Sequence, residues 1–500
     1  MDLSSQHKTT ELPVNGGLYR HVLALNPSPI TSTAWMGAFP PTGLEYIAAS
    51  LKDLVGKVTL VDMRFDTRFS DLEKLNDFIR KEIDLLCISI IWRSGFDQIC
   101  DIVNMLPKEV TTIVGGHQAT EEVETIFARC PNVNLIVRGE GEEIIQKIVA
   151  GVPYPDIAGL SYRENGKIIH NRNAVLPDVA KLRFPDRSLR NCEYRWTQNG
   201  VQLMKYSFDT ILTSRGCPFK CKFCTFSLNP LGQKREYTER PLESVMEELK
   251  TITADMIMIA DDNFFTNPKR SEKLCDMIIE SGIKKMFVAQ TRIDVAKHPA
   301  LLEKAARAGI KILLIGIESP HDWILKLISK GFTQQQARDA FEVLRKFPFY
   351  LHAYFIYGNI GETEEEMLYI ARFAKELGLD SISFQKLRIE KYSPLKEVVE
   401  NTPGYHYDEV GGPVYSDKYD LAALKKIRNK IRSDFYDFAQ MRHILGKFLR
   451  LGIITKADIV RLFLNAPKLL FAVVKRGNEQ KILRRAEETA KQKKLSSSLV

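Results

Sequence analysis

The sequence has no long apolar run and few cysteines for its length. An apolar run in the C-terminal tail, 469–474, holds six residues, whereas a membrane-spanning helix needs about 20. Eight cysteines scattered over 500 residues do not make a secreted disulfide framework, and the polar start 1–10 lacks the apolar core of a signal peptide. We therefore expect a protein of the reducing cytoplasm.

Length and composition indicate a globular chain of several domains. Five hundred residues are too many for one ordinary core and predict two or three domains. The 44% hydrophobic and 27% charged residues are typical of a globular rather than a disordered chain. Changes of pattern divide the chain into four parts, 20–150, 151–204, 205–400 and 401–500.

Three cysteines stand close together with no fourth ligand beside them. Cys217, Cys221 and Cys224 occupy eight residues at CxxxCxxC spacing. A structural zinc site needs a fourth Cys or His, and no candidate lies within this local segment. Thiolates also hold iron–sulfur clusters, and a cubane held by three of them leaves one iron open to a small molecule. The motif therefore predicts a 4Fe-4S cluster with an open iron, and zinc is the alternative.

Short apolar runs alternate with helix-like stretches between residues 20 and 145. The runs are 22–26, 57–63, 85–91, 111–116 and 135–139. Buried runs of that length, separated by helices, predict a doubly wound, Rossmann-like parallel sheet. Ligands of such sheets bind beyond the carboxyl ends of the strands. The loops predicted at those ends are 26–29, 115–117 and 138–142.

Residues 151–204 are predicted to connect two domains. Asn165 and Gly166 stand between two short apolar segments, which is the strongest local signal for a β-hairpin. Several prolines follow the hairpin. Prolines at this density are typical of an extended link.

The alternation of strand and helix returns from about residue 205 to 395. Six candidate strands are 210–214, 256–260, 286–291, 312–317, 352–357 and 381–385. The cysteine motif follows the first of them directly. In barrels of such units, catalytic groups gather at the carboxyl ends of the strands. The acidic, basic and glycine residues at those ends include Asp261, Asp262, Arg292, Glu318, Gly358 and Gly361.

The segment 401–500 is predicted to be mostly helical and basic. Residues 441–500 hold 14 Lys or Arg and 4 Asp or Glu, a balance of +10. Basic residues alternate with apolar clusters such as 462–464 and 469–471. This pattern suits a helix on an anionic membrane surface, and it also suits a packed helix with a solvated basic face. Nucleic acid is the least favoured partner.

The cysteine motif, with Phe223 just before its last cysteine, resembles that of the radical S-adenosylmethionine (SAM) superfamily. The resemblance implies that the open iron chelates the amino and carboxylate groups of SAM. An electron from the cluster then cleaves SAM to a 5′-deoxyadenosyl radical, which abstracts hydrogen from unactivated carbon. The resemblance also implies that the six strand–helix units form a partial (β/α)6 barrel.

The same resemblance implies which residues contact SAM. Its ammonium group needs carboxylates, its carboxylate needs a basic group, its ribose needs hydrogen-bond acceptors, and its adenine approaches the backbone at glycine. The implied contacts are Asp261 or Asp262 at the ammonium group, together with Arg292, Glu318, Gly358 and Gly361.

The N-terminal loops, together with 39–44, resemble the cobalamin-binding domain that precedes many radical SAM barrels. The implied cobalamin contacts are Ser28, Gly43, Gly115, Gly116, His117, Gly139, Glu140 and Gly141. The Asp-x-His-x-x-Gly motif that supplies a histidine to cobalt in other cobalamin domains is absent. We therefore expect cobalamin without a histidine on its lower face, and His117 as a contact or as a solvated residue at a helix start.

Within this superfamily the layout is most similar to hopanoid methylases and more distantly to the anaerobic magnesium-protoporphyrin ester cyclases. The resemblance implies a methyltransferase acting on an unactivated carbon of a large apolar substrate, a lipid, isoprenoid or tetrapyrrole. It also implies three cofactors, a 4Fe-4S cluster, SAM and cobalamin. Electrons would come from a donor of flavodoxin or ferredoxin type.

Three alternatives stay open. One is a cobalamin-dependent radical cyclase or other carbon-skeleton enzyme without methyl transfer. A second is a tRNA methylthiotransferase, although such enzymes hold a second cluster on three N-terminal cysteines. Here Cys87 lies in an apolar strand, and Cys100 and Cys130 lie on predicted helices, so the set does not converge. The third is a non-catalytic cobalamin sensor, which the intact cysteine motif disfavours.

Overall fold

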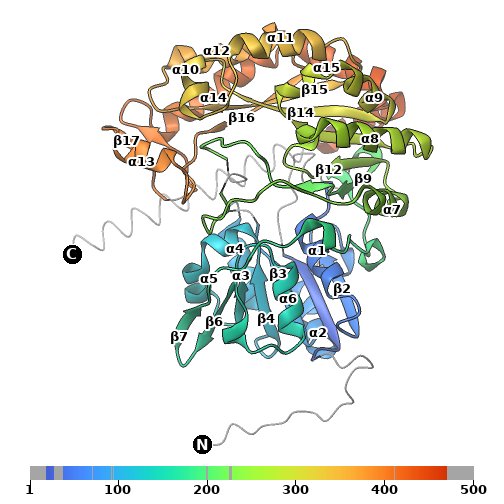
Figure 1. Ribbon diagram of the computed structural model, residues 1–500, viewed down its shortest axis with the longest axis vertical. Helices are drawn as coiled ribbons and strands as arrows, with labels where there is room; N and C mark the ends of the chain where they lie inside the picture. Colours follow the sequence, from blue (N-terminus) through green and yellow to red (C-terminus); the bar gives the residue numbers. More distant parts are fainter. Residues whose placement is uncertain are drawn as a thin grey trace, which may run out of the picture.

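The computed structural model describes residues 18–27, 38–69, 71–91, 93, 95–198, 201–224, 228–409 and 411–469. Two seven-stranded sheets dominate it, one in each half of the molecule (Figure 1). The first sheet and its helices form the lower half of the view, and the second sheet and its outer helices form the upper half.

The first sheet has the strand order β2-β1-β3-β4-β5-β6-β7. Its parallel strands are β1 (His21–Asn26), β2 (Lys57–Asp62), β3 (Leu85–Ser89), β4 (Thr111–Gly115) and β5 (Leu135–Val137). All five coincide with predicted apolar runs, so the doubly wound sheet is confirmed. These strands are apolar because both faces of the sheet are covered.

Helices cover each face of this sheet. On one face lie α1 (Thr42–Ser50) and α6 (Glu142–Val149). On the other lie α2 (Leu72–Glu82), α3 (Phe96–Met105), α4 (His117–Glu121) and α5 (Val123–Arg129). The amphipathic helix α2, for example, buries Leu75 and Ile79 one turn apart against the sheet.

The predicted hairpin is confirmed. It consists of β6 (Leu160–Glu164) and β7 (Lys167–His170), which pair antiparallel. Asn165 and Gly166 both have positive φ, 50° and 77°, as a type I′ turn requires. The sequence placed this hairpin in the connector, but β6 also pairs with β5, so the hairpin extends the first sheet.

The second sheet has the order β16-β15-β14-β13-β12-β9-β8. Its strands are β8 (Arg195–Gln198), β9 (Val201–Ile211), β12 (Met256–Ile259), β13 (Met286–Thr291), β14 (Ile310–Glu318), β15 (Tyr350–Tyr357) and β16 (Ser381–Lys386). The six strands from β9 onward run parallel, which confirms the six predicted units.

The first of these strands differs from the prediction. It begins at Val201 rather than Thr210, because its first half pairs with β8 in a hairpin. It ends at Ile211, and Ser214–Arg215 form a separate short strand, β10, that pairs with β11 (Thr238–Glu239).

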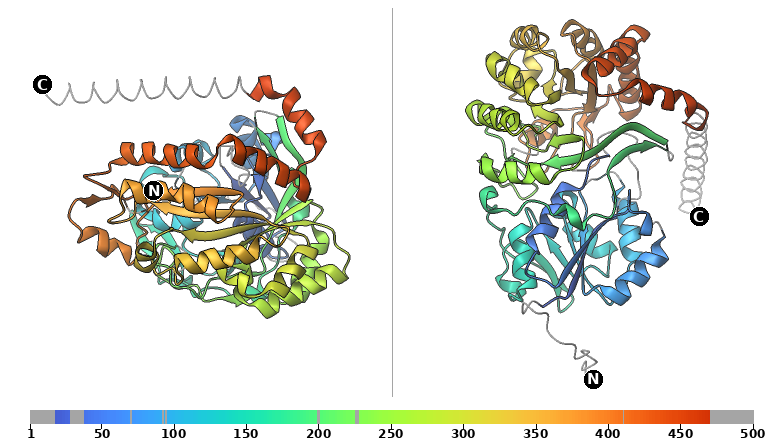
Figure 2. Two further views of the ribbon diagram at one scale, coloured as in Figure 1. Left: turned by 90° about the horizontal axis from the view of Figure 1, so that it is seen from above. Right: turned by 90° about the vertical axis from the view of Figure 1, so that its right-hand side faces the viewer.

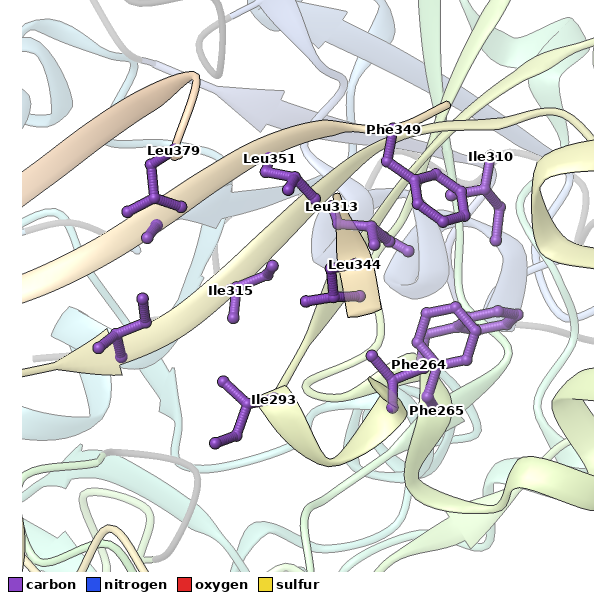
Figure 3. Packing of buried hydrophobic residues seen from close by; sticks show 14 of the residues in the cluster. Phe264, Phe265, Ile293, Ile310, Leu313, Ile315, Leu344, Phe349, Leu351 and Leu379 are labelled. Atoms are coloured by element: carbon purple, nitrogen blue, oxygen red, sulfur yellow. The ribbon is translucent and has the colours of Figure 1, made fainter. Parts of the chain in front are cut away.

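Helices cover the outer face of the second sheet. They are α7 (Leu242–Thr251), α8 (Pro268–Glu280), α9 (Pro299–Arg307), α10 (Asp322–Leu327), α11 (Gln334–Leu344) and α12 (Glu364–Glu376). Successive residues of a strand point to opposite faces. Leu313 and Ile315 of β14 therefore pack under the helices beside Leu344 (Figure 3), whereas Ile312 and Leu314 line the inner face.

The C-terminal part is helical, as predicted. It comprises α13 (Leu395–Glu400), the two-residue strands β17 (Tyr405–His406) and β18 (Tyr415–Ser416), α14 (Leu421–Phe435), α15 (Phe438–Leu451) and α16 (Lys456–Leu464). Short 3₁₀ helices are η2 (Thr67–Phe69), η3 (Tyr154–Asp156), η4 (Val179–Lys181), η5 (Arg187–Leu189), η6 (Phe264–Thr266) and η7 (Ile293–Lys297). Among the described residues, no helix is both long and apolar enough to span a bilayer. Residues 470–500 of the basic tail lie outside the described ranges.

Candidate active site

A cavity of about 450 Å³ lies where the two halves meet. The first sheet contributes its strand ends and the start of α1, and the second contributes the segments after β9 and β12. All predicted cobalamin contacts in the described residues line it, namely Gly43, Gly115, Gly116, His117, Gly139, Glu140 and Gly141. Ser28 lies outside the described residues. Parallel strands thus direct their carboxyl ends from both halves into one space.

The glycines of the cavity wall serve different purposes, and Gly43 leaves backbone open. A Cβ at Gly43 would point into open space, with no atom within 4 Å. Gly116 has φ +112°, and a Cβ there would stand 2.6 Å from the Ile90 carbonyl oxygen. Aliphatic side chains line much of the remaining wall, including Leu44, Ile88, Ile113, Val137 and Leu212. An apolar wall with exposed backbone fits a flat macrocycle with a rim of amides, such as cobalamin.

His117 begins α4 and lines the cavity. Burial lowers the pKa of its imidazole, and the nearby Glu390 carboxylate opposes this effect in part. The side chain therefore lies in the cavity wall rather than in a solvated loop. Its role as a cobalamin contact stays a prediction.

A cluster of ion pairs joins the two halves at the rim of the cavity. Arg215 donates from Nη1 to Glu140 Oε2 at 2.6 Å and from Nη2 to Glu142 Oε1 at 2.5 Å. Arg235 approaches Glu140 Oε1 at 3.3 Å. Sequence reasoning missed both arginines, although Arg215 stands two residues before the cysteine motif. Glu140 thus acts in the interface as well as lining the cavity.

The two adjacent aspartates after β12 have different surroundings. Asp261 is fully buried and accepts hydrogen bonds from Thr213 N and Ser214 Oγ, both at 2.6 Å. Asp262 lines the cavity, accepts a hydrogen bond from Gly216 N at 2.8 Å, and has its pKa raised to about 6 by burial. The two side chains point in different directions, so of the pair only Asp262 faces the cavity.

The three cysteines lie on the loop between β10 and β11, beside the cavity. Cys221 is buried, and Cys224 N donates to Cys221 O at 3.2 Å. Within the described ranges, no three His, Cys, Asp or Glu side chains are gathered in an arrangement for a metal ion. Three thiols on one loop, with a guanidinium beside them, nevertheless match the donors and the charge of a cluster. The ligand set stays a prediction.

That guanidinium belongs to Arg292, which follows β13 and is 7% exposed. Its Nη1 lies 3.7 Å from Cys221 Sγ, and its Nη2 donates to the Lys330 carbonyl at 2.6 Å. The guanidinium carbon stands 3.7 Å from the centre of the Phe219 ring. The structure therefore places the predicted carboxylate-binding residue against the cysteine loop.

Glu318 forms a buried ion pair that the sequence did not indicate. Its Oε1 accepts from Lys330 Nζ at 2.9 Å, and both residues are buried. Lys330 Nζ also stands 5.6 Å from the Phe223 ring, just before the last cysteine. Glu318 has φ +74° at an irregularity in the pairing of β14 with β15. A side chain with this backbone conformation costs about 1–3 kcal/mol, and such strain clusters at functional sites.

The predicted glycines after β15 both need left-handed backbone, with φ +73° at Gly358 and +85° at Gly361. Gly361 N donates to Tyr405 Oη at 2.6 Å. Glu362, which sequence reasoning did not single out, is buried beside them and accepts from Asn359 N at 2.8 Å. The left-handed backbone therefore explains why glycine occupies both positions. Contact of these glycines with adenine stays a prediction.

Comparison with known families gives two matches. Residues 211–374 match the radical SAM superfamily, and residues 35–149 match the B12 binding domain. The first covers β12 to β15 of the second sheet and the cysteine loop, and the second covers β2 to β5 of the first sheet. The cavity therefore lies between the two matched regions.

The chain is also similar in sequence to curated proteins. The chain is 30% identical over 361 residues to an uncharacterized methyltransferase of Pyrococcus horikoshii, covering 69% of this chain and 75% of that one. It is 24% identical over 381 residues to an anaerobic magnesium-protoporphyrin IX monomethyl ester cyclase of Cereibacter sphaeroides (72% and 60%). It is 26% identical over 314 residues to the hopanoid C-3 methylase of Methylococcus capsulatus (60% and 57%). The chain thus spans about three fifths of the last two relatives.

Solved structures share the fold. The radical SAM methyltransferase TsrM of Kitasatospora setae, with cobalamin and a [4Fe-4S] cluster bound, gives a TM-score of 0.63 at 17% identity, over 79% of this chain and 78% of that one. The cobalamin-dependent SAM radical enzyme OxsB, with aqua-cobalamin and SAM bound, gives 0.63 at 17% identity, over 92% and 81%. The chain belongs to the radical SAM superfamily, among the enzymes that carry a B12-binding domain and use a 4Fe-4S cluster, SAM and cobalamin.

Proposed function

We propose that this enzyme transfers a methyl group to an unactivated carbon of a large apolar substrate, a lipid, isoprenoid or tetrapyrrole. The observation that carries the proposal is the single cavity to which both matched regions contribute. Much of its wall is aliphatic, which suits a large apolar substrate. Relatives named as methyltransferases support methyl transfer.

In this proposal residues 20–150 bind cobalamin, and residues 205–400 form the barrel. Cys217, Cys221 and Cys224 hold the cluster. When bound, the cluster supplies the electron that cleaves SAM, and cobalamin carries the methyl group. A donor of flavodoxin or ferredoxin type supplies the electrons. A peripheral position on a membrane is also part of the proposal.

Three groups of this chain would position SAM between these cofactors. Asp262 presents a carboxylate to the cavity. Arg292 presents a cation beside Cys221. The Glu318 pair with Lys330 lies next to Phe223 and supplies a carboxylate oxygen for ribose. A carboxylate and a guanidinium within this set match the ammonium and carboxylate of an amino acid.

The second candidate is a radical cyclase without methyl transfer, which the similarity to magnesium-protoporphyrin cyclases favours. The two reactions differ in their products from SAM. Methyl transfer consumes one SAM to S-adenosylhomocysteine and a second to methionine and 5′-deoxyadenosine. A cyclase forms methionine and 5′-deoxyadenosine but no S-adenosylhomocysteine.

The test is anaerobic reconstitution with iron, sulfide and cobalamin, followed by incubation with methyl-deuterated SAM, a reductant, and lipid or tetrapyrrole extracts. We expect both S-adenosylhomocysteine and 5′-deoxyadenosine, with deuterium in an apolar product. A variant with Cys217, Cys221 and Cys224 changed to Ala should lose the cluster and 5′-deoxyadenosine. Cys275→Ala, a buried thiol in α8, is the matched control and should keep both. Cobalamin binding without S-adenosylhomocysteine or 5′-deoxyadenosine would indicate a non-catalytic cobalamin sensor.

A further inference from the structure

The helices α15 and α16 carry an unusual share of the exposed apolar side chains. Twelve large apolar residues stand exposed in the described part of the chain, and half of them lie on these two helices. They are Phe438, Met441, Leu445, Val460, Phe463 and Leu464, and Phe438, Phe463 and Leu464 are 84%, 80% and 72% exposed. We call these six residues the α15–α16 face.

Each helix collects its exposed residues on one side. Phe438, Met441 and Leu445 are spaced i, i+3, i+7 along α15, and Val460, Phe463 and Leu464 are spaced i, i+3, i+4 along α16. Residues at these spacings share one side of a helix. The two helices follow each other directly at the edge of the barrel half, shown in red in Figure 2.

Packing within the protein does not explain this face, because both helices contact the barrel through other residues, among them Ile459 of α16. Phe448 of α15 stacks on Tyr350, with ring centres 4.5 Å apart, at the start of β15. Lys447 pairs with buried Asp380 at 2.7 Å. Between the helices, Gly452 O accepts from Tyr206 Oη at 2.6 Å. These contacts lie at the amino ends of the strands, opposite the cavity.

The surroundings of the α15–α16 face are basic. Residues 441–469 contain six Lys or Arg and one acid, Asp458. Of the six, Lys447 and Arg461 pair with Asp380 and Asp458. The exposed cations are Arg442, Arg450, Lys456 and Lys468. Apolar side chains surrounded by cations are complementary to a surface with anionic headgroups above hydrocarbon.

We propose that the α15–α16 face docks the enzyme on an anionic membrane. Phe463, Leu464 and Phe438 would enter the headgroup and acyl boundary, and the four cations would contact the headgroups. A second copy of this chain is a poorer partner, because it would bring the same positive charge to the interface. This inference deepens the proposed function by naming where an apolar substrate is met.

The experiment uses the full-length reconstituted enzyme and vesicles of phosphatidylcholine with or without phosphatidylserine. We expect sedimentation with the anionic vesicles only, reversed by salt because exposed charges are screened. Phe463→Ser with Leu464→Ser should weaken binding roughly a hundredfold or more, since burying each of the two side chains is worth about 1.5–3 kcal/mol. Arg442→Gln with Arg450→Gln and Lys456→Gln should abolish the preference for phosphatidylserine.

Two controls separate docking from folding and catalysis. Val175→Ser removes an apolar residue that is 89% exposed in the connector and should bind vesicles as the wild type does. All variants should form 5′-deoxyadenosine in detergent solution at the wild-type rate, because the α15–α16 face lies away from the cavity. If the wild type does not sediment with anionic vesicles but still makes the methylated product, the docking proposal is wrong and the proposed function stands. The docking proposal would also be wrong if Val175→Ser weakened vesicle binding as much as the Phe463 and Leu464 substitutions do, or if α15 and α16 formed a dimer interface.

Discussion

Arg190 and Glu45 form a bidentate ion pair across the junction of the two halves. Arg190 Nε donates to Glu45 Oε1 at 2.6 Å, and Nη2 donates to Oε2 at 2.7 Å. Nη1 of the same arginine donates to Asp209 Oδ2 of β9 at 2.8 Å. The side chains are 10% or less exposed. The pair joins the connector to α1, whose residues Leu44 and Tyr46 line the cavity.

We expect Arg190→Ala to destabilise the protein strongly. Removing one partner of a buried ion pair leaves uncompensated charge and costs about 3–5 kcal/mol. Thermal unfolding should show a large fall in Tm, together with loss of bound cobalamin. Arg183→Ala is the matched control, because Arg183 pairs with Asp53 at the surface (51% and 66% exposed). An equal Tm for the two variants would contradict the expectation.

Substitutions of the two aspartates after β12 should have different effects, one on stability and the other on SAM binding. Asp261→Ala removes the acceptor for Thr213 N and Ser214 Oγ, and each buried donor left unpaired costs about 1–3 kcal/mol. We expect a lower Tm and less iron per chain. Asp262→Asn, which keeps an acceptor for Gly216 N, should keep Tm and iron but weaken SAM binding about tenfold in calorimetric titration. If Asp261→Ala alone impaired SAM binding while remaining stable, the assignment would be reversed.

The Glu318 pair should give a non-additive double-mutant cycle. Glu318→Gln leaves Lys330 buried without its partner and should lower Tm, as should Lys330→Met. The double variant should recover part of the stability. Its SAM affinity should stay roughly ten- to a hundredfold below that of the wild type, because a charged acceptor is worth about 1.5–3 kcal/mol. Wild-type affinity in the double variant would mean that the pair only supports the fold.

His117→Ala should leave cobalamin bound without a change in its lower face. We expect the electron paramagnetic resonance spectrum of cob(II)alamin to lack nitrogen superhyperfine splitting in both wild type and variant. His298→Ala, at the start of α9 on the outer side of the barrel, is the control. Splitting that is present in the wild type and lost in His117→Ala would make this histidine an axial ligand.

Glu362 predicts a pH-dependent stability. Burial raises the pKa of its carboxyl from 4.5 to about 7, although Asn359 donates to it, and Glu366 adds to the rise. The folded state therefore holds a proton that the unfolded state has lost, so this contribution is present below pH 4.5 and is lost as pH rises towards 7. Glu362→Gln should raise the free energy of unfolding at pH 8 by up to about 3 kcal/mol, and with it Tm. At pH 5 the increase should be much smaller. Glu365→Gln, exposed on the same turn, should show no such difference.

The sequence by itself determined the local elements. Apolar runs marked the five parallel strands of the first sheet, because burial on both faces leaves no polar alternation. The Asn165-Gly166 pair marked its hairpin, since positive φ at both positions restricts the residues. The spacing of Cys217, Cys221 and Cys224 marked the loop beside the cavity. Each of these signals depends on neighbours a few residues apart.

Only the tertiary structure decided which side chains of distant segments meet. In the folded chain Asp261 accepts hydrogen bonds from Thr213 and Ser214, whereas Asp262 lines the cavity. The direction of the chain after β12 sets this difference. The tertiary structure also pairs Glu318 with Lys330. The charge of a lysine or arginine is visible in the sequence, but its partner depends on strand register and on the packing of elements far apart along the chain. Long-range pairing of this kind leaves no periodic pattern, so it appears only when the chain is folded.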